Sequence, residues 1–141
     1  MTGVSEGDDI VTLKLLKQKM HDFAQERDWE RYHSPRNLLL ALVGEVGELS
    51  EIFQWKGEVA KGLGDWKEEE KVHLGEELSD VLLYLVRLSD ICGVDLGQAA
   101  LRKIRLNAIK YPPPPPVVSV SQPNADHHAS SLQDVLYLGQ A

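Results

Sequence analysis

Five consecutive prolines, Pro112 to Pro116, limit what this chain can fold into. Proline lacks a backbone N–H and disfavours helical backbone in the residue before it, so any helix must end by Tyr111. The segment 117–141 contains no lysine or arginine and is rich in serine and glutamine. We therefore expect a flexible N-terminus (1–9), a folded domain (10–111) and a proline-rich disordered tail (112–141).

Between residues 10 and 111, apolar residues recur at three- and four-residue spacings, and the alternation typical of strands is absent. This periodicity predicts four helices, near 10–29, 34–56, 66–92 and 95–111. Ser34 followed by Pro35 is a typical helix start, Gly93 a typical stop, and Asp95 a typical N-cap. Because the connections are short, the fold class that we expect is all-α, an antiparallel four-helix-type bundle.

Composition narrows the class of protein. The chain has 141 residues, 43% hydrophobic and 26% charged, which is typical of one soluble globular domain. A net charge of -7 argues against a nucleic-acid partner. No apolar run reaches the roughly 18 residues of a membrane span, and the first ten residues do not resemble a secretory signal. With Cys92 as its single cysteine, we expect a cytoplasmic protein of the cytosol, with the nucleus as a second compartment.

The negative charge is concentrated in one stretch. Residues 45–80 hold eleven acids and four bases, a net of -7 that equals the excess of the whole chain. Glu45 with Glu48, and Glu77 with Asp80, are i, i+3 pairs that interrupt apolar helix faces. Clustered carboxylates at a helix interface are costly unless they are protonated, paired or metal-bound, and all-oxygen ligands favour Mg²⁺ or Mn²⁺. The alternative from spacing alone is that these acids line a wet groove or cap neighbouring turns.

Other residues suit a nucleotide ligand. Four aromatic residues, Trp29, Tyr32, Trp55 and Tyr84, are candidates for stacking on a base, although aromatics at helical spacing also build cores. The last expected helix carries Lys103, Asn107 and Lys110, which are candidates for triphosphate contacts or else a solvated basic face. A carboxylate such as Glu48 is a candidate to orient or deprotonate a water molecule, in addition to a metal-binding role.

The run Glu45-Val-Gly-Glu48-Leu, followed by Glu76-Glu77-Leu-Ser-Asp80-Val-Leu-Leu-Tyr84, resembles the two metal motifs of the all-α nucleoside triphosphate pyrophosphatases of the MazG type. The segments 26–33, 35–43 and 53–56 make the resemblance closest to the eukaryotic dCTP pyrophosphatases. The resemblance covers about residues 15–112. The chain differs from the family pattern at Met20, where the pattern has a pocket histidine; a histidine, His21, is the next residue in this chain.

The resemblance implies a homotetramer that hydrolyses dCTP and base-modified dCTP analogues to the monophosphate and pyrophosphate, cleansing the nucleotide pool. It implies Mg²⁺ as the cofactor, with ligands Glu45, Glu48, Glu77 and Asp80. It also implies a nucleotide pocket, at subunit contacts, lined by Trp29, Glu30, Arg31, Tyr32, His33, Trp55 and Tyr84.

Two other classes of protein remain open. A di-iron carboxylate bundle uses E-x-x-H pairs, and Glu30–His33 and Glu70–His73 have that spacing. However, His33 precedes a proline-started helix and Glu70 lies in a charged first turn, so neither pair is expected to project inward. A non-enzymatic helical scaffold that displays the proline-rich tail is the second alternative.

Overall fold

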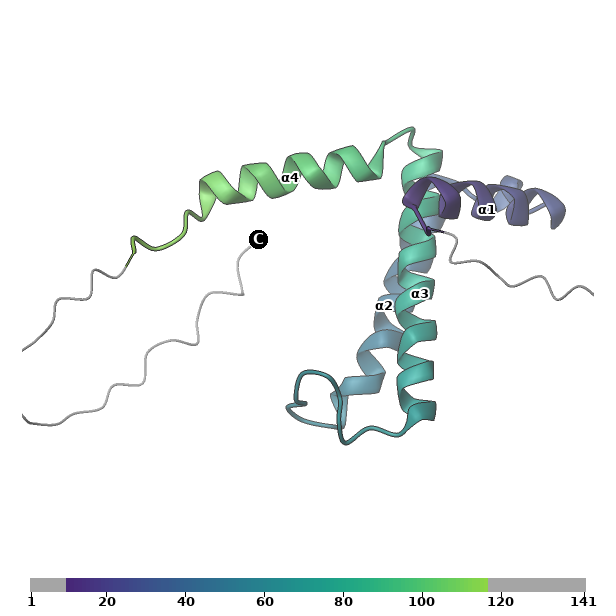
Figure 1. Cartoon of the computed structure of the whole chain (residues 1–141). Coiled ribbons are helices and arrows are strands. Elements are labelled where there is room, and N and C mark those ends of the chain that lie inside the picture. The colour runs from purple at the N-terminus through teal and green to yellow at the C-terminus, as the bar shows by residue number, and fades with distance from the viewer. Residues whose placement is uncertain (1–9, 117–141) are drawn as a thin grey trace, which may run out of the picture. The chain divides into compact units, whose positions relative to one another are not determined.

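The computed structural model describes residues 10–116 (Figure 1). This part of the chain contains four α-helices, one 3₁₀ turn and no strand, which confirms the all-α prediction. None of its helices is long and apolar enough to cross a membrane. The compact unit that contains the helices ends at Tyr111. The expectations for residues 1–9 and 117–141 lie outside the described residues. The elements are α1 (Leu13–Glu26), η1 (Glu30–Tyr32), α2 (Pro35–Gln54), α3 (Glu68–Ile91) and α4 (Leu96–Lys110).

The starts of three helices are fixed by local side-chain caps. Ser34 Oγ accepts the Asn37 N–H at 3.2 Å, and Pro35 occupies the first position of α2, as the sequence predicts. Thr12 caps α1 and Asp95 caps α4 in the same way, each at 3.0 Å. The first turns of these helices therefore depend on hydroxyl or carboxylate oxygens next to them in the chain.

The first helix is shorter than the sequence predicts. It ends at Glu26 because Asp28 adopts the left-handed conformation, with φ 55°, and the Trp29 N–H donates back to the Ala24 carbonyl at 2.9 Å. This closure is the one that glycine usually provides, and a short polar residue such as aspartate tolerates it. The next residues form η1, an element that the periodicity does not predict.

Helices α2 and α3 lie side by side and antiparallel, and α1 packs against α3 (Figure 1). Among the described residues, the buried apolar side chains are few: Ala24, Leu38, Trp66 and Val86. Helix α4 contributes no buried residue. The antiparallel α2–α3 pair is therefore the element of the fold on which the position of any site depends.

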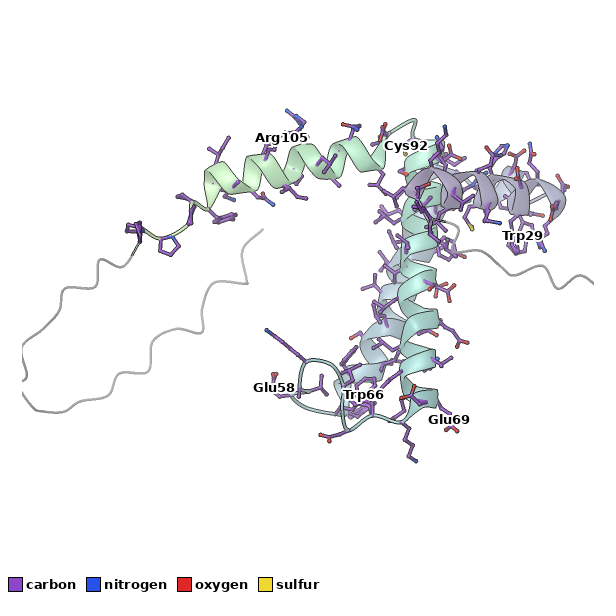
Figure 2. All side chains as sticks on the ribbon, viewed as in Figure 1. Trp29, Glu58, Trp66, Glu69, Cys92 and Arg105 are labelled. Carbon is purple, nitrogen blue, oxygen red and sulfur yellow. The ribbon has the colours of Figure 1, made fainter. Side chains whose placement is uncertain are left out.

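Trp66 lies in the loop that joins α2 to α3 and anchors this loop to the helix pair (Figure 2). Trp66 packs against Phe53, with ring centroids 5.4 Å apart. The Lys56 ammonium lies 4.4 Å above the Trp66 ring and donates to Glu70 at 2.7 Å. Because these contacts hold the end of α2 against the start of α3, they fix the register in which the two helices face each other.

Replacing Ser34 by alanine removes the hydroxyl that accepts the Asn37 N–H. We expect the free energy of unfolding to fall by about 1 kcal/mol, because the first turn of α2 then loses its cap. The measurement is urea denaturation followed by circular dichroism. Ser34→Asp keeps an acceptor at the same position and should retain most of the wild-type stability. A Ser34→Ala variant as stable as the wild type would contradict this assignment.

Candidate functional site

Three glutamates converge where α2 faces α3. Glu45 and Glu48 from α2 and Glu77 from α3 each offer a carboxylate oxygen, and these oxygens all lie within 4.8 Å of one another. The i, i+3 spacing puts the two α2 carboxylates on one face, and the antiparallel register brings that face to Glu77. The helical periodicity predicts that the carboxylates of each pair share one helix face. The register of α2 against α3, which the contacts at the loop end of the pair hold, then brings the two faces together.

The acidic cluster, defined as Glu45, Glu48 and Glu77, carries unfavourable electrostatics. Burial raises the pKa of Glu45, and the charges of Glu48, Asp80 and Glu77 raise it further. The Glu77 side chain is only 12% exposed, and its Oε2 atom is buried without a hydrogen-bond partner among the described residues. A buried carboxylate oxygen without a donor is destabilising, so the cluster is suited to a positively charged ligand.

A divalent cation fits this arrangement. The converging atoms are all carboxylate oxygens, which hard cations such as Mg²⁺ prefer, and the orphaned Oε2 of Glu77 supplies an unused acceptor. Asp80, the fourth expected ligand, lies outside the group of three. It is exposed, lines an open groove together with Glu77, and is close enough for its charge to raise the pKa of Glu45.

Tyr84 lies beside the acidic cluster on α3. Burial raises the pKa of its phenol, and the carboxylates of Glu45 and Asp80 raise it further. Tyr84 therefore keeps its proton under ordinary conditions and can donate a hydrogen bond to an anionic group. Of the expected pocket residues, this is the one that the structure associates with the carboxylates.

Five expected pocket residues lie together on one turn, the Trp29–His33 segment. The side chains of Trp29 and Tyr32 are 45% and 57% exposed, so their rings are available to a ligand. Arg31 is held by Asp28 at 3.1 Å. Backbone bonds close the turn, and the Asn37 side chain donates to the Tyr32 carbonyl at 2.9 Å. Figure 2 labels Trp29 at the end of α1 that leads into this segment.

Trp55 is not brought to this segment. It is 86% exposed at the C-terminal end of α2, whereas the Trp29–His33 segment precedes the N-terminal end. At about 1.5 Å of rise per residue, the 20 residues of α2 separate these two positions by about 30 Å. One nucleotide therefore cannot touch both positions within a single chain.

Other expected contacts lie apart from the acidic cluster. Lys103, Asn107 and Lys110 are exposed on α4. Of the two E-x-x-H pairs, Glu30 lies 3.8 Å from Arg87, and Glu70 accepts from Lys56 and from a backbone N–H at 2.9 Å. Glu30 and Glu70 thus have partners outside the acidic cluster, which weakens the di-iron interpretation.

Sequence reasoning missed one charged residue, Arg87 of α3, which is 1% exposed. Its guanidinium donates to His33 Nδ1 at 3.1 Å and to Asp90 at 3.0 Å. A signal was present: Arg87 follows Asp80 by seven residues, which places both on nearly the same helix face, and it stands in an apolar run. Charged residues are normally exposed, so the pattern alone favoured a surface position.

The chain is similar to known proteins over most of the helical region. The family described as "MazG nucleotide pyrophosphohydrolase domain" matches residues 33–106. Two curated relatives, dCTP pyrophosphatase 1 of Mus musculus and of Homo sapiens, are each 54% identical over 101 residues. These alignments cover 72% of this chain and 59% of each relative, so the chain spans about three-fifths of the length of these relatives.

A solved structure shares the fold. The crystal structure of a pyrophosphatase from Archaeoglobus fulgidus superposes with a TM-score of 0.65 at 33% sequence identity. The match covers 77% of this chain and all of the archaeal chain. The similarity therefore includes the helices that carry the acidic cluster.

Replacing Glu45 by glutamine tests the electrostatics of the acidic cluster. Because the folded chain raises the pKa of Glu45, the ionised carboxylate destabilises the metal-free fold above that pKa. We expect Glu45→Gln to raise the melting temperature at neutral pH by about 2–4 °C, equivalent to about 0.5 kcal/mol. The gain should shrink as the pH falls toward 4.5, where the wild-type carboxyl becomes protonated.

The measurement is thermal unfolding of metal-free protein at several pH values. Glu51→Gln on the same helix is the matched control, because Glu51 is not among the charges that raise the pKa of Glu45. An equal gain in both variants, or a loss in Glu45→Gln, would contradict the electrostatic account.

Proposed function

The chain belongs to the MazG nucleotide pyrophosphohydrolase family, and we propose that it hydrolyses a nucleoside triphosphate to the monophosphate and pyrophosphate with Mg²⁺ as cofactor. The observation that carries this proposal is the convergence of Glu45, Glu48 and Glu77 within the family-matched residues 33–106. A triphosphate is highly anionic, so an acidic site binds it only together with cations. The acidic cluster and the substrate therefore require the same divalent ion.

In this reaction a water oxygen attacks the α-phosphorus, the bond from that phosphorus to the bridging oxygen breaks, and pyrophosphate leaves. Glu45, Glu48 and Glu77 would hold the cation, and the nearby Asp80 would complete the proposed ligand set. When bound, the cation offsets charge on the phosphate oxygens and acidifies a water molecule. In this proposal Glu48, the exposed member of the acidic cluster, orients the attacking water and accepts its proton.

Protein groups around the acidic cluster orient the substrate. Tyr84 keeps its proton and donates to a phosphate oxygen or to a ligating carboxylate. The exposed rings of Trp29 and Tyr32 provide flat apolar surfaces on which a base and a sugar pack. In this proposal the phosphates bind at the acidic cluster, and the base binds at the Trp29–His33 segment.

We propose dCTP and base-modified dCTP analogues as the substrates. Two relatives at 54% identity are named dCTP pyrophosphatase 1, which supports this choice over the other triphosphates. An activity of this kind would remove modified nucleotides from the precursor pool. The catalytic unit is residues 10–111, and the exposed free thiol of Cys92 fits the reducing cytosol that we propose as its compartment.

A homo-oligomer, which we propose to be a tetramer, completes the site. Apolar side chains at i, i+4, i+7 spacing remain 38–60% exposed on both helices of the central pair: Leu39, Val43 and Val46 on α2, and Leu78, Leu82 and Leu85 on α3. Burying such stripes against another copy is favourable. A second copy also provides a route by which Trp55 reaches a nucleotide that Trp29 contacts.

The reaction is tested by incubating the purified protein with each nucleoside triphosphate and Mg²⁺ and resolving the products. We expect dCTP to give dCMP and pyrophosphate, with turnover lost on chelation. Glu48→Gln should reduce turnover by about 100-fold or more, because it removes the carboxylate proposed to handle the water.

Glu51→Gln is the matched control for this assay and should retain turnover, with circular dichroism confirming that both variants are folded. Release of orthophosphate, or no hydrolysis of any triphosphate, would count against the proposed reaction.

The oligomer is tested by introducing a charge into an exposed apolar stripe. We expect the wild type to sediment as a tetramer and Val43→Asp to shift it to smaller species, because an unpaired carboxylate is costly to bury at an interface. Gln25→Asp adds the same charge at an exposed position of α1 and should not change the assembly. A monomeric wild type would rule out this assembly.

A further inference from the structure

A second polar cluster lies away from the carboxylates, around Arg87. Arg87 is the one charged residue among the buried residues of the described chain. A buried guanidinium is strongly destabilising unless its donors are paired, so the groups that it contacts must be held close to it. These contacts connect α3 with α1 and with the Trp29–His33 segment.

The contacts of Arg87 come from three parts of the chain. Its Nε donates to His33 Nδ1 at 3.1 Å, and its Nη1 donates to Asp90 at 3.0 Å. Nη1 also lies 3.5 Å from His21 Nδ1 on α1, and Nη2 lies 3.8 Å from the Glu30 carboxylate. The guanidinium thus holds His33, the residue that follows η1, against α3, while Nη2 itself has no hydrogen-bond partner among the described residues.

The contact with Arg87 determines where His33 carries its proton. An arginine side chain stays protonated in proteins, so its Nε can only donate, and His33 Nδ1 must accept with its lone pair. A neutral imidazole with an unprotonated Nδ1 carries its proton on Nε2. Burial and the Arg87 charge lower the pKa of His33, although Glu30 opposes them, which agrees with a neutral ring.

The position of His33 suits contact with a nucleoside. The ring of His33 packs edge-on to Trp29, with centroids 6.4 Å apart, and Trp29 is an exposed ring suited to stacking. Arg87, which binds His33, lies seven residues beyond Asp80 on α3, or about 10 Å along the helix. If phosphates bind at the carboxylates, the base or sugar of the substrate would have to span about this distance to reach the Trp29–His33 segment.

We propose that Arg87 is a positioning residue that holds His33 as a neutral imidazole, so that His33 Nε2–H donates to an acceptor atom on the base or sugar of the bound nucleotide. The inference rests on the proposed function and deepens it by assigning to Arg87 the control of the tautomer of His33, a residue that the resemblance already places in the nucleotide pocket. A group that can only donate would not pair with the Nε2–H donor, so the arrangement favours nucleosides that present an acceptor there.

The first test is nitrogen-15 NMR of the imidazoles, which needs no turnover. We expect His33 to have an unprotonated Nδ1 and a protonated Nε2, and to have a pKa below the 6.5 of an ordinary histidine. Arg87→Lys keeps the charge but loses the planar fork of donors, so His33 should become a mixture of tautomers. A wild-type His33 protonated on Nδ1, or an Arg87→Lys variant with unchanged tautomer, would overturn the proposal.

The second test is kinetic and uses dCTP with Mg²⁺. We expect Arg87→Lys and His33→Leu to raise KM by about tenfold, the effect of one lost hydrogen bond, with kcat changed much less. His33→Gln keeps an amide donor near the position of Nε2 and should recover part of the loss. Since His33→Gln and His33→Leu both leave Arg87 in place, they test the contact of His33 with the nucleotide even if Arg87→Lys does not fold, and the tautomer of the wild-type imidazole then tests the role of Arg87.

Lys71→Gln, which removes an exposed ion pair from the same helix, is the matched control for stability. A purely structural role of Arg87 predicts lower melting temperatures with unchanged KM, and equal KM values for His33→Gln and His33→Leu; this result would overturn the proposal. If the wild type hydrolyses no triphosphate, the proposed function itself fails, whereas turnover with unchanged KM in the variants refutes only the role of Arg87.

Discussion

The mutual repulsion of carboxylates at the α2–α3 interface is the constraint on which the rest of this structure depends. One carboxylate oxygen from each of Glu45, Glu48 and Glu77 lies within 4.8 Å of the others, and the second oxygen of Glu77 is buried without a hydrogen-bond partner in the part of the chain that the structure describes. Such an arrangement lowers the stability of the metal-free chain, so the packing elsewhere must compensate. Phe53, Trp66 and the Lys56–Glu70 ion pair do so at the loop end of the helix pair.

The small number of buried apolar side chains points to an assembly of more than one copy of the chain. Much of the apolar surface of α2 and α3 remains exposed, and Trp55 lies about 30 Å along α2 from the Trp29–His33 segment. Both features are accounted for if the working unit contains more than one copy. The packing that stabilises the fold and the surfaces that complete the nucleotide pocket are then formed together.

Much of the fold follows from local sequence, because caps and helix periods are local. Ser34 with Pro35, Asp95 and Gly93 mark helix ends where the structure has them, and the acid pairs share helix faces as their spacing predicts. The end of α1 at Glu26 was not predicted, because the aspartate that follows it at position 28 signals a left-handed residue less clearly than glycine does. The buried position of Arg87 was also missed, since tertiary contacts with His33 and Asp90 decide it.

The central claim is that the acidic cluster holds a divalent cation, and electron paramagnetic resonance with Mn²⁺ tests it most directly. During a titration of the protein with Mn²⁺, the resonance signal measures the Mn²⁺ that remains free. Excess Mg²⁺ is then added to compete for the same site. We predict saturable Mn²⁺ binding that Mg²⁺ reverses and that Glu77→Gln weakens strongly, while Glu51→Gln leaves it unchanged. Equal Mn²⁺ binding by wild type and Glu77→Gln, or no binding by the folded wild type, would contradict the account.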